Sequence, residues 1–143
     1  MGQSAMLRPV SASVVPGFTT KLSPRPELNG RIVSTPDGDL AIVMNGIAHF
    51  FENKHVIHAL FGDHSIKPDC PIHDVPPGPT LNDGTCLIRA KGTVDIFLVT
   101  GLPRTRRHLI STYENFKAYG FEMTMVQEIP WLALQAVPVG PVI

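Results

Sequence analysis

Apolar residues in this chain form short runs that are separated by glycine and proline, a pattern typical of short strands and turns. Two runs, 41–44 and 96–99, are apolar throughout, and each is followed one residue later by Gly46 or Gly101. A strand that is apolar throughout is expected to be covered on both faces. The pattern therefore predicts two central strands, each of which turns at its glycine into a third strand, at 48–51 or 104–107.

A helical spacing of apolar residues follows each group of predicted strands. Val56, Leu60 and Phe61 fall on one face of a helix that ends at Gly62, a residue suited to the left-handed position after a helix. A second helix of similar length is predicted to end at Gly120.

These elements recur in the same order, which indicates an internal duplication. Each half begins at an Asn-Gly or Asp-Gly pair, at Asn29 in the first half and at Asp83 in the second. Each half ends in the motif Val-Pro-x-Gly-Pro, which starts at Val75 or Val137. We therefore predict an α+β fold of two tandem β-rich units with one short helix each, following an extended arm. The predicted parts are the Pro-rich arm 1–28, repeat unit 1 at 29–82 and repeat unit 2 at 83–143.

Composition and charge favour a component of an assembly. The 12 Lys and Arg residues balance 12 Asp and Glu, so charge-driven binding to nucleic acid or to an anionic membrane is not expected. No apolar run approaches the roughly 20 residues of a membrane helix, and the start of the chain lacks the pattern of a secretory signal. Only 17 % of residues are charged, which suggests that partners cover part of the surface. We expect a protein that is made in the cytoplasm without a signal peptide.

The arm is the first candidate contact with a partner. Its four prolines disfavour a helix, and Phe18 is its only aromatic residue. We predict that the arm grips a neighbouring protein subunit, most simply a second copy of the chain in a homo-oligomer.

A basic cluster is the second candidate contact. Arg104, Arg106, Arg107 and His108 lie close together in sequence. We interpret them mainly as a solvated strand edge that discourages unwanted sheet pairing. The alternative is a contact for an anion or an acidic glycan.

Aromatic residues supply the remaining candidates. Trp131, the only tryptophan, is expected mainly to anchor the end of the chain on the core, with an exposed sugar-binding platform as the alternative. In the pair Phe50 and Phe51, strand alternation sends one ring inward, and the other ring must be covered by the helix, the arm or another chain.

A metal site has only weak candidates, which are His55, His58, His64, Cys70 and His73. Their spacing matches no standard zinc motif, so we expect neither a metal nor another cofactor. Whether Cys70 pairs with Cys86 is left open. Two residue pairs combine a nucleophile with a base in the sequence, Ser111 with His108 and Cys70 with His73. Neither pair lies in a nucleophile elbow. We therefore assign no catalytic residue.

Several turn and core residues of unit 2 also form a recognisable pattern. They are Asp83-Gly84-Thr85, Gly101, Arg107-His108-Leu109, Tyr119-Gly120-Phe121 and Val137-Pro138-Val139-Gly140. This pattern resembles a short repeat of uncharacterised actinobacterial and phage-associated surface proteins, and unit 1 matches it weakly. The resemblance implies a fold and a cell-envelope or virion setting, and it implies no reaction.

Together these observations predict a non-enzymatic structural or adaptor component of a larger assembly, with a bacteriophage capsid, decoration or tail protein as the implied setting. The alternative is a carbohydrate- or cell-wall-binding module that uses exposed aromatic rings and the basic cluster. An enzyme with a His-rich metal site is the third candidate.

Overall fold

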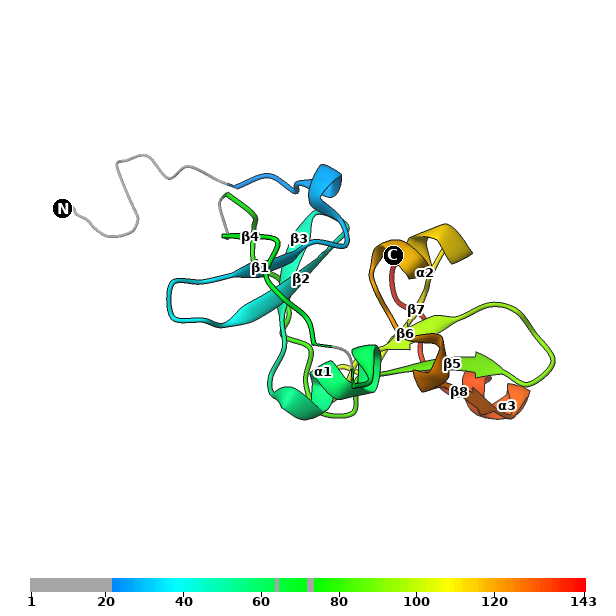
Figure 1. The fold of residues 1–143 in the computed structure, drawn as a ribbon. Coiled ribbons are helices and arrows are strands. Elements are labelled where there is room, and N and C mark those ends of the chain that lie inside the picture. Colours follow the sequence, from blue (N-terminus) through cyan, green and yellow to red (C-terminus); the bar gives the residue numbers. More distant parts are fainter. Residues whose placement is uncertain (1–21, 64, 72–73) are drawn as a thin grey trace.

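Each half of the chain folds into a small β-sheet accompanied by short helices (Figure 1). The computed structural model describes residues 22–63, 65–71 and 74–143. The elements of the first half are η1 (Pro26–Leu28), β1 (Ile32–Ser34), β2 (Leu40–Met44), β3 (Ile47–Phe50), α1 (Lys54–Phe61) and β4 (Cys70–Pro71). The elements of the second half are β5 (Cys86–Ala90), β6 (Phe97–Val99), β7 (Arg107–Leu109), α2 (Tyr113–Ala118), η2 (Met123–Met125), β8 (Val126–Ile129) and α3 (Trp131–Gln135). The predicted α+β class is confirmed.

The two sheets have the same topology, which is what an internal duplication produces. Their strand orders are β3-β2-β1-β4 and β7-β6-β5-β8. In each sheet the first three strands are antiparallel, and the last strand runs parallel to the first. A parallel return needs a crossover connection, and α1 or α2 lies within that connection.

The strand register identifies equivalent positions in the two units. Ile42 of β2 pairs with His49 of β3, and Leu98 of β6 pairs with His108 of β7. Ile42 therefore corresponds to Leu98, and His49 corresponds to His108.

The turn before the third strand differs between the units. In unit 1, Asn45 and Gly46 form a tight turn with φ of 52° and 75°, the left-handed values that such hairpin turns require. In unit 2 a longer loop replaces it, in which the Thr100 hydroxyl accepts a hydrogen bond from the backbone N–H of Arg106. The predicted strand at 104–107 is therefore wrong, because these backbone groups serve the loop and β7 starts only at the end of that range.

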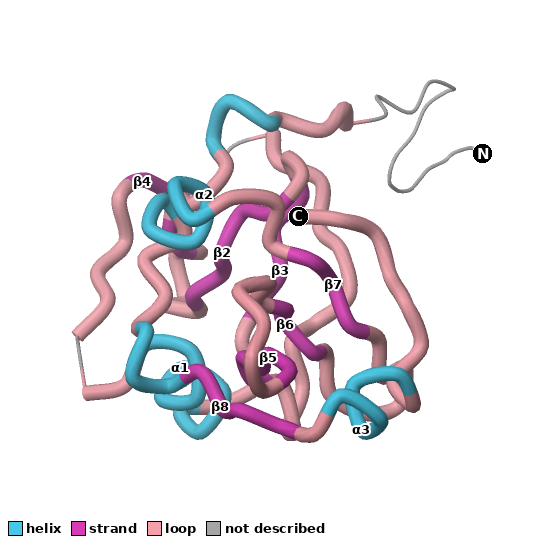
Figure 2. The backbone as a smooth tube through the Cα atoms, turned by 90° about the vertical axis from the view of Figure 1, so that its right-hand side faces the viewer, coloured by secondary structure: helices cyan, strands magenta, loops and turns pink. Residues whose placement is uncertain are grey.

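One hydrophobic core is shared by both units. Ile42 and Leu98 bring one face of each sheet into it, and Leu60 of α1 and Phe116 of α2 fill the space between them. Helix α1 contacts β5 of the other unit, and Figure 2 shows it beside β5 and β8. Because both units contribute to this core, neither unit buries its apolar residues alone.

The outer face of each sheet is covered by a different element. Leu28 of η1 packs on the outer face of the first sheet, while Leu134 of α3 packs on that of the second. The backbone N–H of Arg25 donates a hydrogen bond to the carbonyl of Gly46 at 2.9 Å, which fixes the chain before η1. The end of the predicted arm thus lies against unit 1, and residues 1–21 lie outside the described residues. Among the described helices, none combines the length and apolar character needed to cross a bilayer.

Candidate binding groove

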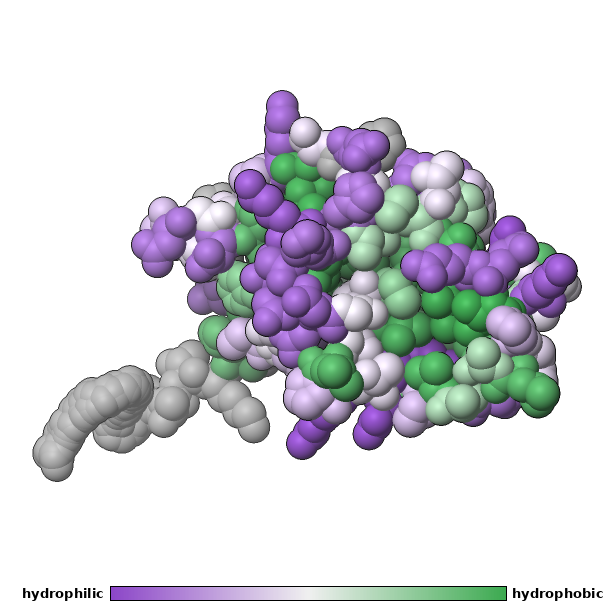
Figure 3. All heavy atoms as spheres, turned by 90° about the horizontal axis from the view of Figure 1, so that it is seen from below, coloured by the Kyte–Doolittle hydropathy of each residue, from purple (hydrophilic) through white to green (hydrophobic). Residues whose placement is uncertain are grey.

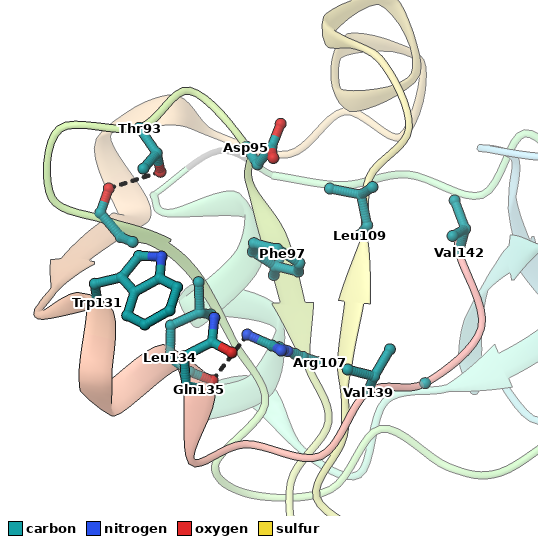
Figure 4. Close-up of a pocket in the computed structure, with 12 residues that line it drawn as sticks. Thr93, Asp95, Phe97, Arg107, Leu109, Trp131, Leu134, Gln135, Val139 and Val142 are labelled. Carbon is teal, nitrogen blue, oxygen red and sulfur yellow. Dashed lines mark hydrogen bonds between the residues drawn. The ribbon is translucent and has the colours of Figure 1, made fainter.

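A groove opens on the outer face of the second sheet (Figure 4). It has a volume of about 330 Å³ and lies between α3, β6, β7 and the C-terminal segment. Phe97 and Arg107 lie between its two walls, with Trp131 on one side and Val139 on the other. The sheet therefore forms the floor, and the last part of the chain forms both walls.

Helix α3 positions the tryptophan. Pro130 precedes the helix in an extended conformation with φ of −60°, the value to which its ring is restricted. Leu134 is buried on the sheet, whereas Trp131 is 56 % exposed. The expectation that Trp131 anchors the end of the chain in the core is wrong, because Leu134, one helical turn later, takes that role.

Arg107 places a positive charge in the floor of the groove. One of its Nη atoms donates a 2.9 Å hydrogen bond to the Leu134 carbonyl, and its guanidinium carbon lies 5.5 Å from the centre of the Phe97 ring. Its Nε atom is buried and has no hydrogen-bond partner within the described chain. No ion pair of Arg107 is found among these residues either. The site therefore holds a positive charge that has no ion-pair partner among the described residues.

The walls of the groove are exposed and apolar. Val139 is 70 % exposed and Val142 is 52 % exposed. In Figure 3, hydrophobic side chains gather on the side of the molecule that carries α3, next to hydrophilic ones. Asp95 and Gln135 add polar groups to the lining. Apolar walls with a few convergent polar groups are typical of a ligand-binding site.

The equivalent face of unit 1 is closed. By strand register, Phe97 corresponds to Ala41 and Arg107 to Ala48. Both alanines are 0 % exposed, and Leu28 packs on the same cluster. The groove is therefore a feature of unit 2 alone within the described part of the duplicated fold.

The two proline-rich closing segments lie beside the third strands. They form isolated bridges from Pro77 to Ala48 and from Val139 to Arg107. His108 holds the second segment, because its Nδ1 lies 2.8 Å from the Pro141 carbonyl oxygen. Of the four predicted basic residues, His108 is thus engaged in a structural hydrogen bond.

The other predicted partner contacts are dispersed. Arg104 and Arg106 are exposed in the loop before β7 and do not line the groove. Phe51 packs against the shared core, with its ring 5.9 Å from that of Phe61, and Phe50 packs on the outer face of the first sheet. Phe18 lies outside the described residues. The structure therefore brings together only Arg107 and Trp131 of the predicted set.

The proposed metal ligands do not converge where the structure describes them. His55 is exposed, and His58 Nε2 lies 3.2 Å from the Asp63 carboxylate. Within 22–63, 65–71 and 74–143, no three His, Cys, Asp or Glu side chains are placed to hold a metal ion. His64 and His73 lie outside these ranges, and for Cys70 only its backbone in β4 is described.

Of the two nucleophile candidates, Ser111 and His108 are engaged elsewhere, while the Cys70 side chain and His73 lie outside the described residues. The Ser111 hydroxyl accepts a 2.6 Å hydrogen bond from the Asn115 side chain, and His108 contacts Pro141 instead of Ser111. Cys86 is a free thiol. Burial raises the pKa of the Cys86 thiol, which disfavours the reactive thiolate.

Sequence reasoning missed most of the groove. Phe97, Gln135 and Val139 were not singled out, because they converge only when the end of the chain folds back over the second sheet. A local signal for α3 did exist, since Pro130 stands at a favoured helix start and Leu134 lies one turn after Trp131.

Comparisons with known proteins give no relative for this chain: no family model, no curated protein and no solved structure matches it.

Proposed function

We propose that this protein is a non-enzymatic structural or adaptor subunit that binds an extended peptide segment of a protein partner in the Trp131 groove. The observation that carries this proposal is the 56 % exposure of Trp131 at the edge of a groove of about 330 Å³. A large aromatic ring left exposed beside an apolar hollow is a frequent anchor point for partners.

The chemistry of the groove supports a proline-containing peptide as its ligand. Such a peptide is extended, and its carbonyl groups have no internal hydrogen bonds, so they need donors from the binding protein. The groove lining includes the exposed Trp131, whose indole N–H is a donor, and the guanidinium of Arg107. The rings of Trp131 and Phe97 offer the aromatic surface on which proline packs.

A carbohydrate is the second candidate ligand, and one observation favours it. Asp95 and Gln135 line the same groove as the exposed Trp131 ring. Sugars are bound by such a combination of an aromatic face with carboxylate and amide side chains. The aliphatic residues Leu109, Val139 and Val142 favour the peptide, because they offer a sugar hydroxyl no partner.

The sequence supports a proposal for the wider setting of the protein. The resemblance to a repeat of phage-associated and actinobacterial surface proteins supports a virion or cell-envelope assembly. The low content of charged residues, 17 %, supports a surface that is partly covered by other subunits.

Titration of the full chain with two ligand sets tests the proposal. One set holds short apolar peptides with one or two prolines, and the other holds chitin and peptidoglycan oligosaccharides. We expect calorimetry to detect binding of the peptides and its loss in the Trp131→Ala variant. Binding of the sugars without the peptides, or peptide binding that Trp131→Ala leaves unchanged, would reject this function.

A further inference from the structure

We propose that the Trp131 groove selects a peptide with an acidic residue, whose side-chain carboxylate pairs with Arg107 in the floor of the groove. This inference rests on the proposed function, because it adds a specificity-determining residue to the same peptide site. It narrows the ligand from any extended, proline-containing segment to one that carries an aspartate or a glutamate among its apolar residues.

Arg107 presents accessible hydrogen-bond donors to the groove. An arginine side chain has five N–H groups, and the one on Arg107 Nε is buried. One Nη atom donates a hydrogen bond to the Leu134 carbonyl. The other Nη atom forms no hydrogen bond with the described residues and, unlike Nε, is not buried. Its two N–H groups are therefore free to bind a ligand.

The guanidinium group is held in place before a ligand binds. Its hydrogen bond to the Leu134 carbonyl measures 2.9 Å, and its carbon atom lies 5.5 Å from the centre of the Phe97 ring. A side chain that is already fixed loses little conformational entropy when a ligand pairs with it. Guanidinium groups form short, charge-assisted hydrogen bonds with carboxylates. Arg107 is therefore a preorganised anchor for an acidic group.

No carboxylate of the described residues compensates the Arg107 charge. Asp95 supplies the carboxylate in the groove lining, but it is exposed and forms no ion pair with Arg107. Phe97 pairs with Leu109, and this pair lies between Asp95 and Arg107 on the sheet (Figure 4). Around the guanidinium the lining is mainly apolar, so water screens its charge less than on an open surface. Charge complementarity therefore favours an acidic ligand.

The charge is a feature of this groove and has no counterpart in unit 1. By strand register, the buried Ala48 stands at the position of Arg107. The neighbouring Arg104 and Arg106 are exposed in the loop before β7 and do not line the groove. Arginine and tryptophan are the residues that most often dominate the energy of protein interfaces. Arg107 and Trp131 therefore supply two anchors in one groove.

A side-chain carboxylate fits this position better than the carboxylate at the end of a peptide. Arg107 lies in the floor formed by the sheet, between the walls that carry Trp131 and Val139 (Figure 4). An extended peptide directs alternate side chains towards one face. One of these side chains reaches the floor, whereas the backbone, to which a terminal carboxylate belongs, stays at the level of the walls.

A matched pair of peptides tests this inference on the full chain. Both peptides are short, apolar and amidated at the C-terminus, and both contain one proline; one has a central glutamate where the other has glutamine. Calorimetry at low ionic strength should show that the glutamate peptide binds about tenfold more tightly to the unmodified protein. Added salt should reduce this preference, a measurement that needs no variant.

Two variants assign the preference to Arg107. Arg107→Gln should bind both peptides alike, and this equality is independent of any general loss of affinity that a looser α3 causes. Arg106→Gln is the matched control, because it removes the same charge from the exposed loop outside the groove and should keep the preference. Circular dichroism should show that both variants are folded.

The outcomes separate this inference from the function on which it rests. Equal binding of the two peptides to the unmodified protein would overturn the inference, and so would a preference that survives Arg107→Gln. The same holds if a free C-terminal carboxylate, and not the central glutamate, strengthens binding. If Trp131→Ala still abolishes the binding of both peptides in these cases, the groove remains a peptide site. If neither peptide binds, both proposals fail together.

Discussion

His49 and His108 hold the two proline-rich segments in the same way. In each, the ring Nδ1 lies 2.8 Å from a backbone carbonyl oxygen, that of Pro79 or Pro141. A carbonyl oxygen only accepts, so Nδ1 of each ring carries the proton and donates it. Because Val139 lies close before Pro141 in the chain, the His108 hydrogen bond also fixes one wall of the groove.

Acidification should destabilise the fold through His49. Burial of the ring lowers the pKa of His49; the hydrogen bond to the Pro79 carbonyl opposes this shift in part, and His108 lowers the pKa further. The unfolded chain therefore binds a proton more readily than the folded chain, so stability is complete above about pH 6.5 and declines as the pH falls below it.

Thermal melting between pH 7.5 and pH 5.5 measures this effect, with the slope of melting temperature against pH as the readout. His49→Gln should reduce the slope, while His55→Gln, which changes an exposed histidine, should leave it unchanged. A slope that is equal in all three proteins would contradict the assignment to His49.

Gly78→Ala should destabilise the protein by crowding the same histidine. A Cβ added at Gly78 would lie 2.9 Å from His49 Cε1 and 2.5 Å from Ile47 Cγ2. Overpacking of this kind costs about 1–3 kcal/mol of unfolding free energy, which urea denaturation measures. Gly140→Ala should behave alike, since its Cβ would meet the His108 ring. An unchanged urea midpoint in both variants would show that the segments are held more loosely than described.

Leu60→Ala should lower the stability of both units, which should still unfold in one transition. Leu60 lies in α1 of unit 1 and is 0 % exposed in the core that the units share. Its truncation should cost about 2–5 kcal/mol. Trp131 emission reports on unit 2 and circular dichroism on the whole chain, and the two should follow one shifted transition. Separate transitions from the two probes would mean that the units unfold independently.

Arg107→Lys should loosen α3 although it preserves the charge. Lysine cannot reproduce the planar group that donates to the Leu134 carbonyl and lies near the Phe97 ring. The loss should be about 1–2 kcal/mol, with faster hydrogen exchange of the α3 amides. Arg106→Lys is the control, because Arg106 is exposed and bonds only its neighbour Thr105 through its side chain. If the α3 amides exchange at the same rate in both variants, Arg107 does not position α3.

The duplication could be predicted from the sequence because glycine and proline recur at positions whose backbone conformation favours them. Examples are the Asn45-Gly46 turn and the repeated Val-Pro-x-Gly-Pro motif. Strand register was less readable. The sequence pattern aligned Gly46 with Gly101, whereas strand pairing makes Ile42 equivalent to Leu98. The two alignments of the units differ by one position, because a longer loop follows β6.

The groove could not be read from the sequence for a physical reason. Its walls are built by α3 and the last residues of the chain, and they are placed by long-range contacts such as Arg107 to Leu134. Trp131 was expected in the core because tryptophan buries a large area. Its exposure depends on which side of a five-residue helix faces the sheet, and Leu134 decides that.

The emission spectrum of Trp131 tests the central claim most directly, because Trp131 is the only tryptophan in the chain. The account predicts that a saturating apolar peptide with one or two prolines shifts the emission of the protein to shorter wavelength, as the exposed ring becomes covered. The Val139→Asp variant, which carries a charge in the groove wall, should show no shift. An emission maximum that does not move when the peptide is bound, or no binding at all, would contradict the account.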